Sequence, residues 1–156
     1  MRDNRIDLIR PDAPELAAPG PHRIGVTTLH AVDRGRPDIA RAVAGEPVSV
    51  YDRPLTLEVW YPADVAADTP PTPYENVLLR DGETTATLFG RAVRDVAPAS
   101  TGPCPLVVLS HGYPGNRFLM SHLGENLAGK GYVVAAIDHA DSTYADQGAF
   151  GSTLVN

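Results

Sequence analysis

The stretch PLVVLSHGYPGNRFLMSHLGENLAGKGYVVAAIDHADS, residues 105–142, decides the fold of this chain. It opens on Leu106–Leu109, an aliphatic run that is too short for a helix and is typical of a strand covered on both faces. The next seven residues contain two glycines and a proline, which break the strand. The pattern therefore predicts a buried strand that ends in a loop at Ser110.

A helix and a second strand complete this stretch. Leu119, Leu123 and Leu127 follow the loop at four-residue spacing, so they share one face of a predicted helix. Gly131 ends the helix, and residues 132–137 form a second apolar strand. Two buried strands joined by a helix predict a right-handed, parallel βαβ unit.

Upstream of this unit the patterns are more mixed. Residues 1–24 are rich in proline, charge and alanine, and predict a loosely packed N-terminal arm. Alternation and β-branching predict strands over 25–32 and 55–61. Leu88, Ala92 and Val96 share a row at four-residue spacing, which predicts a helix over 83–96.

The motifs resemble those of the α/β-hydrolase superfamily. The resemblance rests on a strand ending in Ser110-His111-Gly112, a second strand ending in Asp138-His139-Ala140-Asp141, and the upstream run from Arg53 to Pro62 that reads RPLTLEVWYP. The nearest likeness is to bacterial dienelactone-hydrolase-like proteins and platelet-activating factor acetylhydrolases. It covers residues 25–142 and implies an α/β fold with a mixed sheet, ordered 1-2-4-3-5 onward, with the first strands antiparallel and the rest parallel.

The resemblance also implies a role for the loop after the first core strand. Gly112 and the backbone N–H of Tyr113 would form half of an oxyanion hole, which stabilises the charge that develops on a carbonyl oxygen during acyl transfer. His111, Pro114, His139 and Asp141 would line the substrate cleft, because ligands bind beyond the carboxyl ends of parallel strands. The expected partner is a small ester or lactone, with no cofactor. An ordinary turn between strand and helix is the alternative interpretation.

The nucleophile that such hydrolases need is absent from residues 1–156. They carry it in a G-x-S-x-G elbow, and no serine of this sequence lies in that motif. We therefore assign no catalytic residue, and interpret residues 25–156 as the N-terminal part of a hydrolase domain with an incomplete sheet. A non-catalytic binding module on the same fold and one half of a split hydrolase, which would need a C-terminal half as partner, remain open.

Two other arrangements of the site histidines can be weighed against the oxyanion loop. His111 follows Ser110 directly, but adjacent strand residues point to opposite faces, so the two are not expected to form a nucleophile–base pair. His111 is better interpreted as a residue that orders the loop. Metal binding by His111, His122, His139 and Asp141 lacks any helical H-x-x-x-H pair or similar spacing, so no metal is expected.

Composition excludes several classes of function. The net charge of -6 comes without a basic stripe, which argues against nucleic-acid binding. The single cysteine, Cys104, excludes an internal disulfide and a cysteine-based zinc site. No apolar run has the length of a signal peptide or a membrane span, so we expect a cytoplasmic protein without a membrane-spanning segment.

Overall fold

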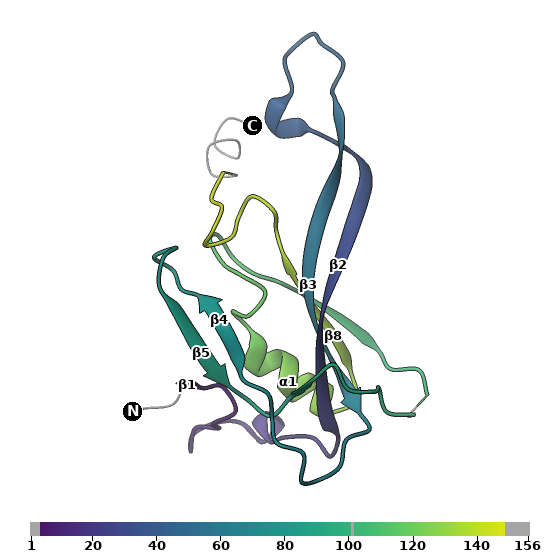
Figure 1. Cartoon of the computed structure of the whole chain (residues 1–156), viewed down its shortest axis with the longest axis vertical. Helices are drawn as coiled ribbons and strands as arrows, with labels where there is room; N and C mark the ends of the chain where they lie inside the picture. Colours follow the sequence, from purple (N-terminus) through teal and green to yellow (C-terminus); the bar gives the residue numbers. More distant parts are fainter. Residues whose placement is uncertain (1–3, 101, 149–156) are drawn as a thin grey trace.

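A twisted mixed sheet forms the body of the molecule in the computed structural model, which describes residues 4–100 and 102–148 (Figure 1). A smaller sheet of three strands lies on the other side of the single α-helix that these residues contain. In sheet order, the strands of the large sheet are β6 (Val93–Arg94), β2 (Arg23–Pro37), β3 (Val50–Ala63), β8 (Val133–Asp138) and β7 (Leu106–Ser110).

The order of the long strands is the one that the resemblance implies. β2, β3, β7 and β8 correspond to the expected strands one to four, and they lie in the order 1-2-4-3. β3 is antiparallel to both β2 and β8, whereas β7 and β8 are parallel. The predicted βαβ unit and the predicted mixed α/β sheet are thus confirmed, and the first two strands are longer than their sequence patterns indicated.

The helix of the βαβ unit, α1 (Ser121–Gly129), packs on β2, β3 and β8 through a face that the leucine spacing did not predict. Small and polar residues make this face: Ser121, Gly124, Glu125 and Ala128 are all buried. A Cβ atom on Gly124 would lie 2.7 Å from the indole ring of Trp60, so only glycine allows this approach of helix and strand. Leu119 precedes the helix, and both it and Leu123 are at least one-third exposed.

The prediction of a helix over residues 83–96 is wrong. Residues 85–89 instead form β5 (Thr85–Phe89), the central strand of the small sheet, and residues 93–94 form β6. β5 is flanked by β4 (Tyr74–Leu78), which is antiparallel to it, and by β1 (Asn4–Arg5), which is parallel. Threonines at 84, 85 and 87 favour a strand, and they outweigh the four-residue spacing of the apolar side chains.

Glu125 explains why the chain turns between β5 and β6. Its buried carboxylate accepts hydrogen bonds from the backbone N–H groups of Arg91 (2.8 Å) and Ala92 (3.2 Å) and from the Tyr74 hydroxyl (2.6 Å). A helix would direct those N–H groups to carbonyls one turn earlier. Burial raises the pKa of Glu125, against the opposing effect of these donors.

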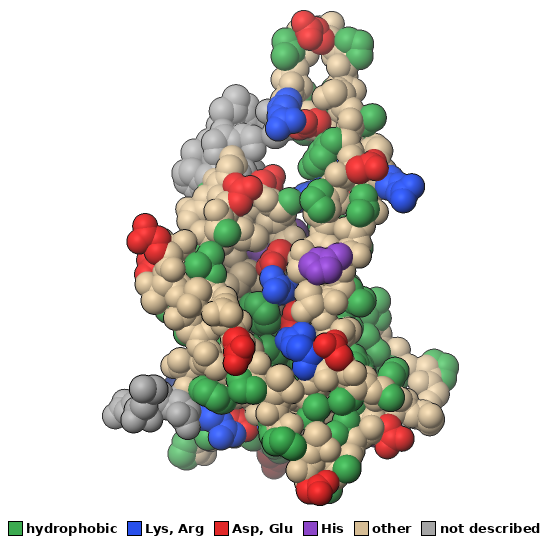
Figure 2. Space-filling model, viewed as in Figure 1, with side chains coloured by type: hydrophobic (Ala, Val, Ile, Leu, Met, Phe, Trp, Pro, Cys, Tyr) green, Lys and Arg blue, Asp and Glu red, His purple; other side chains and the backbone are tan. Residues whose placement is uncertain are grey.

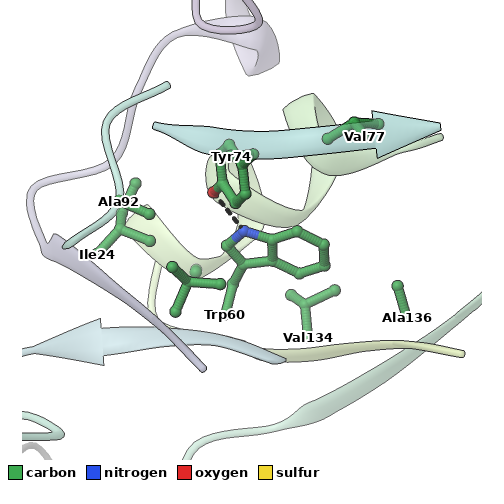
Figure 3. Close-up of a cluster of buried hydrophobic side chains, with 9 residues drawn as sticks. Ile24, Trp60, Tyr74, Val77, Ala92, Val134 and Ala136 are labelled. Carbon is green, nitrogen blue, oxygen red and sulfur yellow. Dashed lines mark hydrogen bonds between the residues drawn. The ribbon is translucent and has the colours of Figure 1, made fainter. Parts of the chain in front are cut away.

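The main core lies between the two sheets (Figure 3). Trp60 on β3 is completely buried, and its indole N–H donates to the hydroxyl of Tyr74 on β4, at 2.7 Å. The other buried members of the cluster are Ile24, Val26, Val77, Ala92, Ala128, Val134 and Ala136.

The strands β2 and β3 continue beyond the sheet as a hairpin that projects from the body (Figure 1). A short 3-10 helix, Ile39–Arg41, follows β2 at the far end. Hydrophobic side chains are exposed along this hairpin (Figure 2), among them Val32, Val43, Val48 and Val50. The projecting part therefore contributes little apolar burial.

The N-terminal segment rests against the C-terminal half of α1. It contains β1 and a 3-10 helix, Glu15–Ala17. The Asn126 side chain donates to the carbonyl of Ala17 at 2.8 Å, and the N–H of His22 donates to the carbonyl of Gly129 at 3.0 Å. None of the helices in the described ranges has the length and apolar character needed to cross a lipid bilayer.

The strand β7 is an edge of the large sheet. Within the described residues it pairs only with β8, so the backbone groups on its other side have no strand partner. The side chains of Leu106 and Val108 are 64% and 56% exposed, whereas Val107 packs against the core. The prediction that this strand is covered on both faces is therefore wrong for the residues described, and the exposed face is apolar.

This edge predicts self-association of the chain. An apolar strand edge without a charge or a proline is a template for intermolecular pairing. We expect the 156-residue chain to associate through Leu106–Leu109, and Val108→Lys to shift it towards monomer, as measured by sedimentation velocity. Val32→Lys is the matched control, because Val32 is equally exposed, at 54%, but lies on the hairpin. A monodisperse wild-type monomer with a sharp thermal transition would contradict the prediction.

Candidate active-site loop

The loop that follows β7 is tied to the segment that follows β8. The N–H of Gly115 donates to the carbonyl of Ser142 at 3.1 Å, and the N–H of Tyr144 donates to the carbonyl of Gly115 at 2.9 Å. The Tyr113 hydroxyl donates to the carbonyl of Gln147 at 2.7 Å. These bonds join the carboxyl ends of two neighbouring parallel strands, the place where ligands bind in such sheets.

The imidazole of His111 is held inside this loop. Its Nδ1 atom lies 2.7 Å from the carbonyl oxygen of Gly112, and its Nε2 atom lies 3.2 Å from the backbone nitrogen of His139. A Cβ atom on Gly115 would come within 2.7 Å of Nδ1, so the ring packs directly on a backbone that must be glycine. The structure thus places His111 and His139 together, at the carboxyl ends of the adjacent strands β7 and β8.

A contact between Ser110 and His139 was not predicted. The hydroxyl oxygen of Ser110 lies 2.7 Å from Nε2 of His139. The register of the two strands explains it, because β7 and β8 are parallel neighbours and both residues stand at their carboxyl ends. The strand order of the resembling fold was the signal that could have revealed this pair.

His139 stays neutral more readily than a histidine exposed to solvent, because its pKa is lowered. Burial lowers the pKa of His139, and the positive potentials of His111 and Arg53 lower it further. The rings of His111 and His139 meet edge to face, with centroids 4.8 Å apart. A neutral imidazole can accept a proton from a hydroxyl, so Ser110 and His139 have the arrangement of a weak donor and its base.

The remaining residues assigned to the cleft lie around this pair. Asp141 forms an ion pair with Arg53 on β3, at 3.5 Å. Pro114 follows Tyr113 through a cis peptide bond. The cavity lined by Ser110, His111 and Arg117 has a volume of about 10 Å³, which is room for roughly one water molecule. The described residues alone therefore do not enclose a substrate-sized cleft at the loop.

A network of charged side chains joins β3 and β6 to the end of β8 and to the segment between the loop and α1. Glu58 on β3 has no solvent exposure, and its carboxylate binds the guanidinium groups of both Arg94 and Arg117. Arg117 also binds the carboxylate of Asp138 through its guanidinium and its backbone N–H. The network fixes the start of the segment leading to α1 against the end of β8.

No metal-binding cluster accompanies these residues. Within residues 4–100 and 102–148, no three His, Cys, Asp or Glu side chains lie close enough together to hold a metal ion. A cavity of about 590 Å³ lies elsewhere, between the N-terminal segment and α1.

Comparison with known proteins places the loop in a family context. Residues 80–150 match the family described as platelet-activating factor acetylhydrolase, isoform II. The structure is similar to that of a ferulic acid esterase from Streptomyces cinnamoneus, with a TM-score of 0.64 and 36% sequence identity. That similarity covers 82% of this chain and 37% of the esterase chain. No curated protein sequence matched the chain.

These similarities confirm the resemblance deduced from the motifs. The chain has a partial α/β-hydrolase fold with a mixed sheet, similar to that of the esterase, and it spans less than half the length of the esterase chain. The family match includes the loop from His111 to Asn116 and the end of β8.

Proposed function

We propose that this chain supplies the oxyanion-hole loop of a serine esterase that acts on a carboxylic ester or lactone through an acyl-enzyme. In this proposal the backbone N–H of Tyr113 is one oxyanion donor. The nucleophile, its acid and its base lie in residues outside the 156 of this chain. The similarity to an acetylhydrolase family and to a ferulic acid esterase supports the ester as substrate class.

The observation that carries the proposal is the tethering of the loop. Gly115 is bonded on both sides to residues 142–144, and His111 contacts the Gly112 carbonyl, so the peptide between Gly112 and Tyr113 is held in place. A Cβ atom on Gly112 would meet nothing within 4 Å, which leaves open space beside that peptide for a substrate carbonyl. A preorganised donor of this kind lowers an acyl-transfer barrier by about 2.7–4 kcal/mol.

The contact between Ser110 and His139 favours a second candidate, in which Ser110 is itself a nucleophile. Its hydroxyl lies 2.7 Å from a ring nitrogen whose pKa is lowered by burial. Ser110 is on β7 itself, whereas esterase nucleophiles occupy a strained turn that exposes the hydroxyl. We therefore favour the oxyanion loop, and a covalent probe can separate the two candidates.

The test uses the complete gene product that contains residues 1–156 and a serine-directed fluorophosphonate. We expect one adduct, on a serine outside residues 1–156, and none on Ser110. Replacement of Tyr113 by proline removes its N–H and should lower kcat for a p-nitrophenyl ester by about a hundredfold or more. Tyr113→Phe keeps that N–H and loses the hydroxyl bond to Gln147, so a much smaller loss is expected.

Two outcomes would overturn the proposal. An adduct on Ser110 that disappears in Ser110→Ala would make the Ser110–His139 pair the reactive site. Equal losses of kcat in Tyr113→Pro and Tyr113→Phe, with both proteins folded by circular dichroism, would make the phenol the functional group and not the backbone donor.

A further inference from the structure

We propose that His111 is a positioning residue that orients the oxyanion donor, and that it does so only as the neutral imidazole with its proton on Nδ1. This inference rests on the proposed function, because it concerns how the Tyr113 N–H is aimed. Neither histidine takes part in bond making. The proposal assigns the two ring nitrogens of His111 different tasks.

The first task belongs to Nδ1. A carbonyl oxygen can only accept, so the 2.7 Å contact with Gly112 requires a proton on Nδ1. The Gly112 carbonyl and the Tyr113 N–H belong to one planar trans peptide, in which they point in opposite directions. The bond that fixes the carbonyl towards the ring therefore fixes the N–H away from it. His111 sets the direction of a donor that it does not touch.

The second task belongs to Nε2. The backbone N–H of His139 can only donate, so its 3.2 Å contact requires a lone pair on Nε2. This bond anchors the ring to the end of β8, while Gly115 supports the ring from the side of the loop. One tautomer of the neutral ring satisfies both neighbours. Protonation would place a second donor against the His139 N–H and break the anchor.

The charged groups around the ring are paired with one another. The His139 ring meets His111 edge to face, and the lowered pKa of His139, caused first by burial, favours a neutral His139 ring beside His111. Asp138 is bound by Arg117, and Asp141 is bound by Arg53. The nearby carboxylates are thus engaged by arginines, and the His111 ring contacts a carbonyl and an N–H group.

The test uses nuclear magnetic resonance of the 156-residue chain, in the Val108→Lys background that opposes association. Long-range ¹H–¹⁵N spectra at pH 7.5 should show His111 as the Nδ1–H tautomer. The ¹⁵N order parameter of Tyr113 should be that of a rigid backbone, about 0.85.

Two substitutions separate the tasks of the two nitrogens. His111→Asn keeps a donor at the position of Nδ1 and should retain most of the Tyr113 order. His111→Gln moves the amide out to the position of Nε2 and leaves no donor at the position of Nδ1, so the order parameter should fall below about 0.6, the flexible range. His139→Ala is the matched control, because it removes the second ring but keeps the backbone N–H of residue 139.

The outcomes are decisive without any activity measurement. An Nε2–H tautomer of His111 in the protein that keeps this residue would overturn the proposal. A rigid Tyr113 backbone in His111→Gln would overturn it as well. The tautomer is read on a protein that keeps His111, so a variant that does not fold leaves that result standing. A failure of the oxyanion-hole proposal would appear separately, as an adduct on Ser110 or as equal effects of the two Tyr113 substitutions.

Discussion

Replacing Trp60 by alanine is expected to lower the free energy of unfolding by about 3–5 kcal/mol. The indole has no solvent exposure and lies between α1 and the small sheet. The approach of Gly124 to its ring shows how closely the helix packs there, so the helix cannot easily settle into the vacated space. A cavity would remain, and its cost adds to the lost burial.

Urea unfolding followed by circular dichroism measures this loss. Tryptophan fluorescence cannot be used, because Trp60 is the only tryptophan in the sequence. Trp60→Phe is the control. It retains much of the apolar volume but removes the N–H that donates to Tyr74, so a smaller loss of about 1–2 kcal/mol is expected. A loss below about 1 kcal/mol in Trp60→Ala would show that the two sheets collapse around the missing ring.

Replacing Glu58 by glutamine is expected to destabilise the fold by about 3–5 kcal/mol. The substitution preserves shape but removes the negative charge on which Arg94 and Arg117 converge. The side chains of those arginines are only 28% and 24% exposed, so water cannot fully replace the carboxylate. Removal of the Glu58 charge takes away the carboxylate that Arg94 binds, and it leaves Arg117 with Asp138 as its carboxylate partner.

Glu75→Gln provides the comparison for this experiment. Glu75 is exposed on β4, and the same chemical change there should alter stability by less than about 0.5 kcal/mol. If the two substitutions have equal effects in urea unfolding, Glu58 is not a structural charge, and the network contributes nothing beyond packing.

Local patterns were sufficient for the βαβ unit. Leu106–Leu109 is a short run ended by glycines and proline, and residues 132–137 have the same character, so both strands could be predicted within a residue of their observed bounds. Their neighbours in the sheet could not be read from periodicity. The order 1-2-4-3 came from the resemblance, because pairing between distant strands leaves no local signal.

Failures of prediction arose where a single buried side chain decides the local structure. The helix expected over 83–96 does not form, because Glu125, more than thirty residues later, takes the N–H groups of Arg91 and Ala92. The leucine spacing likewise indicated the wrong face of α1, because Trp60 requires a glycine against its ring. Both choices depend on partners that are distant in sequence.

The sequence predicted the position of the candidate-site loop, but it did not predict the contacts that the loop residues make. The motif placed His111, Gly112 and Tyr113 at the end of β7, as observed. The pairing of Ser110 with His139 and the anchoring of His111 on a backbone N–H depend on the register between β7 and β8. A sequence pattern carries residue types, whereas these contacts depend on how two strands are aligned.

The position of β8 between β3 and β7 has a consequence for synthesis on the ribosome. β7 precedes β8 in the chain, yet within the described sheet β8 is its only neighbour. Translation adds about 5–20 residues per second. The apolar β7 segment therefore leaves the ribosome before β8 and stays unpaired until β8 has been synthesised. During that interval it is available to chaperones that bind short aliphatic segments. A synonymous codon change that slows translation between Ser110 and Val133 would lengthen this exposure without altering any contact of the finished fold.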